Sequence, residues 1–182
     1  KEITLNLAKE ALKHYQKNDI REVDASIIID SVSRYFNLSV ETEKCPYYLA
    51  KMVRGVKIGE SPEFIKRRLT AAGMRPINNV VDISNYVMLE YGQPLHFFDK
   101  DKLGNNILVR DAKENEEIVT LDGKTRVLNS DDIVITDGKK PVCIAGVMGG
   151  ENTEVDLNTK NILIESAIFN PVSIRYTSRK LE

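Results

Sequence analysis

The sequence predicts an α+β fold with a β-rich, barrel-like core of short antiparallel strands and helices packed outside it. Three observations support this class. Apolar residues recur at helical spacing in the first half of the chain, short runs of strand character fill the second half, and two Asp-Gly pairs separate neighbouring runs, Asp122-Gly123 and Asp137-Gly138. Asp-Gly between two such runs is a strong hairpin signal. Several successive hairpins favour a closed or nearly closed barrel.

The chain divides into residues 1–36, a helical N-terminal segment of open role, and residues 37–182, the main domain. Helical spacing is carried first by Leu5, Ala8, Leu12 and Tyr15. Asp24 is a candidate cap for a second helix, although the β-branched run at 27–29 would also suit a strand. Alternating apolar residues then predict two strands, one around Leu38 and Val40 and one around Leu49 and Val53.

Two further helices are predicted in the middle of the chain. Ser61 is a good N-cap and Pro62 suits the first helical position, with Gly73 as the end. The apolar face of that helix is expected to hold Phe64, Ile65 and Leu69. Asn79 can cap the next helix, which ends at Gly92 and turns inward Val80, Ile83 and Val87.

From residue 95 onward the chain is predicted to be mainly β. The short runs with strand character are Ile107–Val109, Glu117–Leu121, Thr125–Leu128, Ile133–Thr136, Pro141–Ala145 and Ile162–Ile164. Asn170-Pro171 then has the cap and first-position residues of a last helix.

The composition excludes several classes of protein. A chain of 182 residues with 42% hydrophobic and 29% charged residues can bury a core and is not disordered. The net charge of -1 excludes a strongly basic protein that coats a long duplex, but not local contact with the end of a single strand. No apolar run approaches the ~20 residues of a membrane-spanning helix, and the first residues lack a secretory signal, so we expect a cytoplasmic location. The chain lacks an initiator Met, as a trimmed piece would.

Metal binding is not favoured by the potential ligands. The two cysteines, Cys45 and Cys143, are far apart, and the two histidines are His14 and His96. A zinc site usually takes four ligands in close pairs. We therefore expect free thiols, no metal site, and a solvated His14 on its helix.

Two titratable residues stand out as candidates for chemistry. His96 titrates near neutral pH, so it suits a general base or a donor to a substrate oxygen, and a half-buried histidine bonded to a carbonyl is the alternative. Glu165 ends the apolar run Ile162–Ile164. It is either an outward side chain of an alternating strand or a buried acceptor that needs a donor, because an unpaired buried carboxylate is costly.

Two further motifs admit a chemical interpretation. The glycine-rich stretch 146–150 lacks the Gly-Lys-Ser/Thr of a phosphate loop and is a tight turn or a wall close to a ligand. A hydrolase triad of Ser84, His96 and Asp99 is disfavoured, because no Gly-x-Ser-x-Gly elbow surrounds the serine.

Several ordered blocks resemble the editing domain of the beta subunit of bacterial phenylalanyl-tRNA synthetases. They are the stretches 75–90 (RPINNVVDISNYVMLE), 92–96 (GQPLH), 144–150 (IAGVMGG), 164–167 (IESA) and 173–179 (SIRYTSR). The resemblance covers roughly Cys45 to Leu181. Residues 1–36 do not contribute to it.

The resemblance implies an activity and a set of site residues. The family charges tRNA(Phe) with phenylalanine, and this domain hydrolyses tyrosine attached by mistake. It implies catalytic roles for His96, Asn85 and Ser84, and substrate-binding roles for Glu165, Gly146 and Gly149. His96, Ser84, Asn85, Gly149 and Glu165 are then expected to line one cavity. Ser84 stands where many relatives have threonine, a change that keeps the hydroxyl. In these relatives a further segment helps to close the pocket, and the present sequence ends before it.

The resemblance also implies the molecules with which the protein acts. It implies no cofactor in this piece and ATP and magnesium in the full enzyme. The expected partners are the 3' end of tRNA(Phe) and the alpha subunit, with no membrane. A non-catalytic module of the same fold that binds RNA or protein is the alternative.

Overall fold

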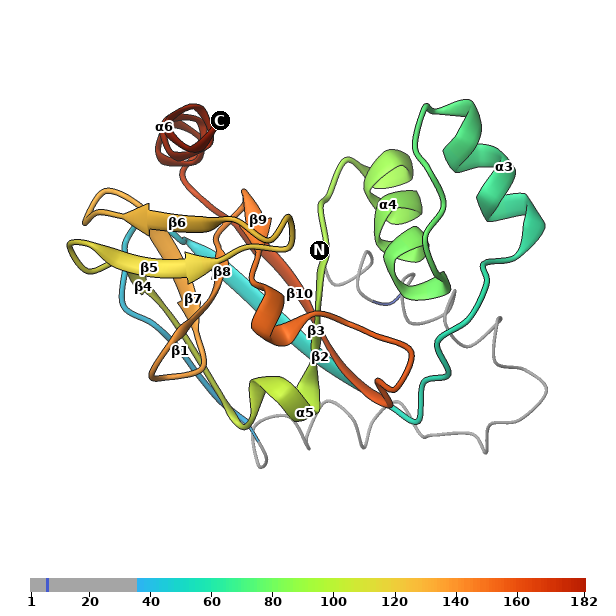
Figure 1. Cartoon of the computed structure of the whole chain (residues 1–182), viewed down its shortest axis with the longest axis horizontal. Helices are drawn as coiled ribbons and strands as arrows, with labels where there is room; N and C mark the ends of the chain where they lie inside the picture. Colours follow the sequence, from blue (N-terminus) through green and yellow to red (C-terminus); the bar gives the residue numbers. More distant parts are fainter. Residues whose placement is uncertain (1–5, 7–35) are drawn as a thin grey trace.

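The computed structural model describes residue 6 and residues 36–182 (Figure 1). The helices predicted within 1–35, and His14, lie outside these residues. The α+β class is confirmed. The helices within residues 36–182 are α3 (Glu63–Ala71), α4 (Asn79–Tyr91), α5 (Lys100–Leu103) and α6 (Pro171–Leu181), with a 3-10 turn η1 (Glu151–Thr153).

The strands form three sheets rather than one closed barrel. The five-stranded sheet has the order β1 (Asn37–Val40), β4 (Asn106–Asp111), β7 (Ile133–Thr136), β8 (Pro141–Ile144) and β9 (Met148–Gly149). The three-stranded sheet has the order β2 (Tyr47–Arg54), β10 (Asn161–Ile168) and β3 (His96–Asp99). The third sheet is the hairpin of β5 (Glu116–Val119) and β6 (Thr125–Leu128). Both Asp-Gly hairpins, β5–β6 and β7–β8, are antiparallel as predicted, whereas β1 pairs with β4 in parallel.

The three-stranded sheet lies between two apolar cores. Ile162 and Ile164 of β10 pack with the buried faces of α3 and α4. Leu163 points the other way and packs with residues of the five-stranded sheet such as Val142. Figure 1 shows the same arrangement, with α3 and α4 on one side of β10 and the five-stranded sheet on the other. Successive side chains of a strand point to opposite faces, so burial on both faces explains the uninterrupted apolar run of β10.

The start of α3 differs from the prediction. Pro62, not Ser61, is the N-cap, and no side chain caps this end. The Ser61 hydroxyl instead donates a hydrogen bond to the buried carboxylate of Asp82 on α4. Phe64 is 49% exposed and meets Tyr86 of α4 edge-on, so its assignment to the apolar face was wrong. The end at Gly73 is confirmed by its positive φ of 79°.

The cap of α4 lies one residue earlier than predicted. Asn78 is the N-cap, and its side chain accepts from the amides of Val80 and Val81. Asn79 is buried, with its amide group bonded to the Gly59 N–H at 3.1 Å and the Lys57 carbonyl at 2.9 Å. Two adjacent asparagines cap equally well, so the contact with the loop 57–59 decides between them. Gly92 ends α4 in the left-handed conformation, as predicted.

The last helix begins as predicted and is held on the five-stranded sheet. Asn170 caps α6 and Pro171 occupies its first turn. The helix is fixed by Asp132, a buried carboxylate that accepts from the Thr177 hydroxyl at 2.7 Å and from the ammonium of Lys180. Burial opposes ionisation of Asp132, but the bonds from Lys180, the Asn129 amide and Thr177 outweigh it and lower the pKa of the carboxyl.

Replacing Asp132 with Ala should destabilise the fold by about 2 kcal/mol, because Thr177 and Lys180 lose a charged acceptor. Urea unfolding of the chain measures this change. The pKa of Asp132 is lowered on folding, so its stabilising effect is present above pH ~4 and is lost as the pH falls through the folded-state pKa. The exposed neighbour Asp131 supplies the control, Asp131→Ala. Equal effects of the two changes would contradict the assignment.

Candidate functional site

The candidate site lies on the face of the three-stranded sheet that looks toward the five-stranded sheet. Glu165 of β10 has His96 of β3 as its direct Cα partner on one side and Ala50 of β2 on the other. Residues opposite each other in an antiparallel pair point to the same face. The pairing therefore sets an imidazole beside a carboxyl, although the two residues are far apart in the sequence.

Glu165 is buried, with 5% of its surface exposed, and its oxygen Oε2 accepts a hydrogen bond from the Tyr48 hydroxyl at 3.0 Å. Burial destabilises the carboxylate and raises the pKa of Glu165 to about 8, although the bond from Tyr48 acts to lower it. Of the two readings of Glu165, the structure excludes the outward side chain. The buried acceptor has a donor within the protein, Tyr48, which the sequence reasoning missed.

The surroundings of this carboxyl are dry. Burial, and then the nearby carboxyl, raise the pKa of the Tyr48 hydroxyl well above its usual value. The same two causes raise the pKa of the Cys143 thiol. Both cysteines are buried and neither forms a disulfide bond, as expected. Tyr48, Ala50 and Met52 alternate with outward residues along β2, and this period-2 pattern was the available signal for Tyr48.

His96 is a half-buried ring packed against its neighbours. Burial lowers the pKa of His96 to about 4, so the imidazole is neutral at neutral pH. Its ring meets Phe98 edge-on at 4.4 Å. A Cβ at Gly149 would lie 2.6 Å from Cε1 of His96, which is closer than van der Waals contact permits. A side chain at position 149 would therefore displace the imidazole, so Gly149 leaves the space that the His96 ring occupies.

The other glycine of this stretch serves a turn. Gly146 has a φ of 66° between β8 and β9, a conformation that other residues rarely adopt. A Cβ at this position would lie 3.2 Å from Cδ1 of Ile174, on α6. Gly146 thus meets the last helix, while Gly149 meets His96. The stretch 146–150 therefore contains the predicted tight turn and lies against His96 at Gly149.

The two remaining candidates lie on α4. The Ser84 hydroxyl donates to the carbonyl oxygen of Leu95 at 2.6 Å, which ties the helix to the residue before His96. Asn85 follows on the same helix and is half-buried. The core of α4 packs on the sheet face that carries Ile164, opposite to the face of Glu165. The structure therefore brings together His96, Gly149 and Glu165. Ser84 lies on the other side of the sheet, where it is bonded to the backbone of Leu95.

No hydrolase triad is assembled by the described residues. Asp99 lies three positions after His96 on β3 and so points to the opposite face. Its carboxylate caps α5 through the amides of Asp101 and Lys102 and accepts from the Thr159 hydroxyl at 2.6 Å. The lack of a Gly-x-Ser-x-Gly elbow disfavoured this triad, and the geometry agrees.

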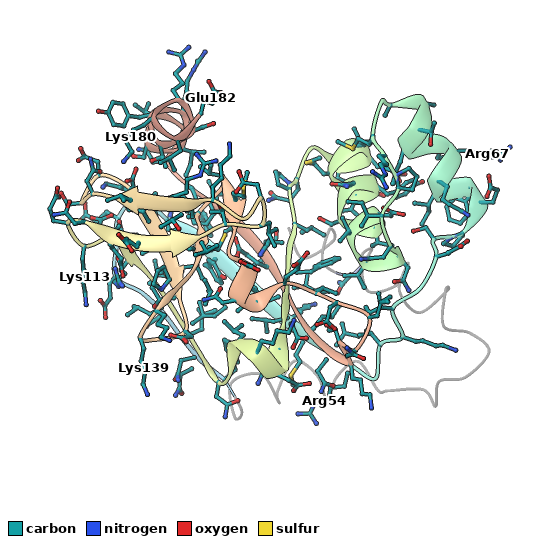
Figure 2. All side chains as sticks on the ribbon, viewed as in Figure 1. Arg54, Arg67, Lys113, Lys139, Lys180 and Glu182 are labelled. Atoms are coloured by element: carbon teal, nitrogen blue, oxygen red, sulfur yellow. The ribbon has the colours of Figure 1, made fainter. Side chains whose placement is uncertain are left out.

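Other surface features lie away from this site. A hollow of about 510 Å³ is lined by Phe36, Asn37, Met52, Arg54, Lys100, Asp101, Asn105 and Asn161. Figure 2 shows basic side chains pointing outward at four separate places, Arg54, Arg67, Lys113 and Lys139. Among residues 36–182, no group of three or more His, Cys, Asp or Glu side chains could hold a metal ion. None of the helices described is both long and apolar enough to cross a membrane.

Comparison with known proteins identifies a family model and relatives that match this chain. The family model of the B3/4 domain matches residues 44–182. A Staphylococcus saprophyticus protein named phenylalanine–tRNA ligase beta subunit is 53% identical over 162 residues, which are 88% of this chain and 20% of that protein. The Fusobacterium nucleatum protein of the same name is 45% identical over 179 residues, 97% of this chain and 22% of that protein. The chain thus spans about a fifth of the length of these relatives.

A solved structure shares the fold. It is an N-terminal fragment of the phenylalanyl-tRNA synthetase beta subunit from Pyrococcus horikoshii, with a TM-score of 0.53 and 14% identity. The match covers 80% of this chain and 48% of that one. At this identity the likeness supports the fold alone.

Replacing Glu165 with Gln should stabilise the chain at alkaline pH. The pKa of Glu165 is raised on folding to about 8, so the folded state holds a proton that the unfolded state releases above pH ~4.3. Stability is therefore lost as the pH rises from there through about 8. Glutamine does not titrate, so the advantage of the variant should grow over this range and then level off. Thermal unfolding from pH 5 to pH 9 measures it.

The control for this experiment is Glu117→Gln, at an exposed glutamate of β5. A difference between Glu165→Gln and the parent that stays constant with pH would show that the Glu165 carboxyl is ionised in the folded protein across the whole range.

Proposed function

The chain belongs to the B3/4 domain family, and on that premise we propose that it is the editing domain of a phenylalanine–tRNA ligase beta subunit, which hydrolyses tyrosine wrongly attached to tRNA(Phe). The observation that carries the proposal is the pairing of His96 with the buried Glu165 on adjacent strands, with Gly149 against the imidazole. An imidazole suits the ester and an acidic side chain suits the phenol of such a substrate.

His96 supplies the group for ester hydrolysis. A water molecule attacks the ester carbonyl carbon, loses a proton, and the ribose oxygen leaves with one. The imidazole is neutral because burial lowers the pKa of His96 to about 4, so its nitrogen can accept a hydrogen bond from the attacking water. A base with so low a pKa removes protons weakly. We therefore assign His96 chiefly to holding the water or the ribose in position, and positioning alone is a large source of rate.

Glu165 supplies the discrimination between tyrosine and phenylalanine. A pocket built for phenylalanine rejects a ligand that merely adds a hydroxyl by only about 10². A second site that requires the hydroxyl discriminates better, because phenylalanine leaves the polar group of the site without its bond. The cost of such an unpaired buried group is roughly 1–3 kcal/mol. The carboxyl of Glu165, in dry surroundings, has the character that this role demands.

The remaining candidates are Ser84, Asn85 and Gly146. Ser84 sets the backbone at Leu95 and so the position of His96, and we assign it to positioning rather than to contact with substrate. Asn85, beside it on α4, is proposed to reach the substrate from that helix. Gly146 is proposed to form part of the pocket wall beneath Ile174.

The rest of the reaction belongs to the full enzyme. We assign to it the alpha subunit as partner, the 3' end of tRNA(Phe) as the segment delivered to this site, and ATP with magnesium for charging. No step of the hydrolysis proposed here runs through ATP or a metal ion.

Deacylation of tyrosyl- and phenylalanyl-tRNA(Phe) by the full enzyme tests this function. Glu165→Ala should bring the two rates closer by roughly tenfold or more, because it removes both the bond to tyrosine and the penalty against phenylalanine. His96→Ala should slow both substrates by about 100-fold without changing their ratio. Glu117→Ala, at an exposed glutamate, is the control.

Two outcomes would overturn the proposal. An unchanged ratio in Glu165→Ala would leave that residue a purely structural carboxyl. Binding of charged tRNA with no deacylation above the spontaneous rate would instead identify a non-catalytic RNA-binding module of the same fold.

A further inference from the structure

We propose that Tyr48 is a positioning residue for discrimination, which holds one oxygen of the Glu165 carboxyl so that the other faces the hydroxyl of the substrate. The inference rests on the proposed function, since it assigns a role within the same site.

The geometry gives the two carboxyl oxygens different environments. Tyr48 donates its hydroxyl to Oε2 of Glu165 at 3.0 Å, and no bond to Oε1 accompanies it. Within the described part of the chain, the one fully buried side-chain polar atom without a hydrogen-bond partner is Oγ of Ser166. Oε1 of Glu165 has no such partner and is not among the fully buried atoms, so it is accessible at the edge of a residue that is 5% exposed. The atom that can meet a ligand is the one that Tyr48 leaves free.

Tyr48 reaches this position through the register of the sheet. Its Cα partner on β10 is Ala167, two residues after Glu165 and on the same face. Diagonal neighbours on one face of an antiparallel pair are within reach of long aromatic side chains. The hydroxyl of Tyr48 remains protonated at neutral pH, because burial and the nearby carboxyl raise its pKa. The Tyr48 hydroxyl is thus always a hydrogen-bond donor. It fixes the rotation of the Glu165 carboxyl and determines that Oε2 is the oxygen that is bonded.

The bond from Tyr48 also tunes the charge of the carboxyl. It acts to lower the pKa of Glu165, against the burial that raises it to about 8. A substrate phenol donating to Oε1 would favour the ionised form further, since a hydrogen bond to an ionised acceptor is the stronger one. Discrimination for tyrosine should therefore rise with pH through a midpoint near 8. Loss of the Tyr48 hydroxyl should move that midpoint to higher pH.

Tyr48→Phe in the full enzyme tests the inference. It removes the hydroxyl and keeps the ring, so the packing of the site is preserved. We expect the ratio of tyrosyl- to phenylalanyl-tRNA deacylation to fall about tenfold at pH 7.5, mainly through a higher KM for tyrosyl-tRNA. We also expect the pH midpoint of this ratio to rise. In a Glu165→Gln background the same change should have no further effect on the ratio, because Tyr48 acts through the carboxylate.

Tyr47→Phe is the matched control, because Tyr47 is the preceding residue of β2 and is 63% exposed. A Tyr48→Phe enzyme that slows both substrates equally, with no shift of the pH midpoint, would show a structural role only and would overturn the inference while leaving the editing function in place. A parent enzyme without tyrosyl-tRNA deacylation would overturn the proposed function itself, and the role of Tyr48 with it.

Discussion

The burial of β10 on both of its faces is the constraint on which the rest of the structure depends. Ile162 and Ile164 fill the core beneath α3 and α4, and Leu163 fills the core against the five-stranded sheet. A carboxyl on this strand is almost wholly removed from water, so its charge must be paired or neutralised. Tyr48 donates a hydrogen bond to the Glu165 carboxyl. The raised pKa of Glu165 keeps this carboxyl neutral below about pH 8. The same burial removes water from His96, whose ring lies against Gly149.

Features fixed by neighbouring residues were predictable from the sequence. The hairpin at Asp137-Gly138 and the start of α6 at Asn170-Pro171 depend on local backbone preferences, and both stand as expected. Choices settled by distant contacts were not. Asn78 and Asn79 are equivalent caps until the loop 57–59 selects one of them. The separation into three sheets depends on pairings such as that of β1 with β4, whose partners are 69 residues apart, and no local pattern encodes them.

The residues of the candidate site also divide into those that the sequence indicated and those whose contacts it did not reveal. The resemblance to a known family pointed to His96, Glu165 and Gly149, and the structure groups these three. Tyr48 escaped notice because its contact with Glu165 spans 117 residues of chain and depends on the register of β2 against β10. Ser84 was weighed as a reacting hydroxyl, but its bond to the Leu95 carbonyl makes it part of the support for His96. A side chain's chemistry can be read from sequence, while the atom it faces cannot.

The anchoring of α6 by Asp132 has a mechanical consequence for the strand that precedes it. β10 runs into α6 within three residues, and the amide of Asn170 between them is bonded to the Lys44 carbonyl at 2.7 Å. At the opposite end of the strand, the side chain of Asn161 is tied to Asp101 at 2.9 Å. Hydrogen bonds therefore hold β10 in place at both of its ends. A slip of one residue would turn every side chain over, burying the carboxyl among the apolar residues under α4. The hydrogen bonds at the two ends thus fix the register of β10, and the register in turn fixes the position of Oε1 of Glu165.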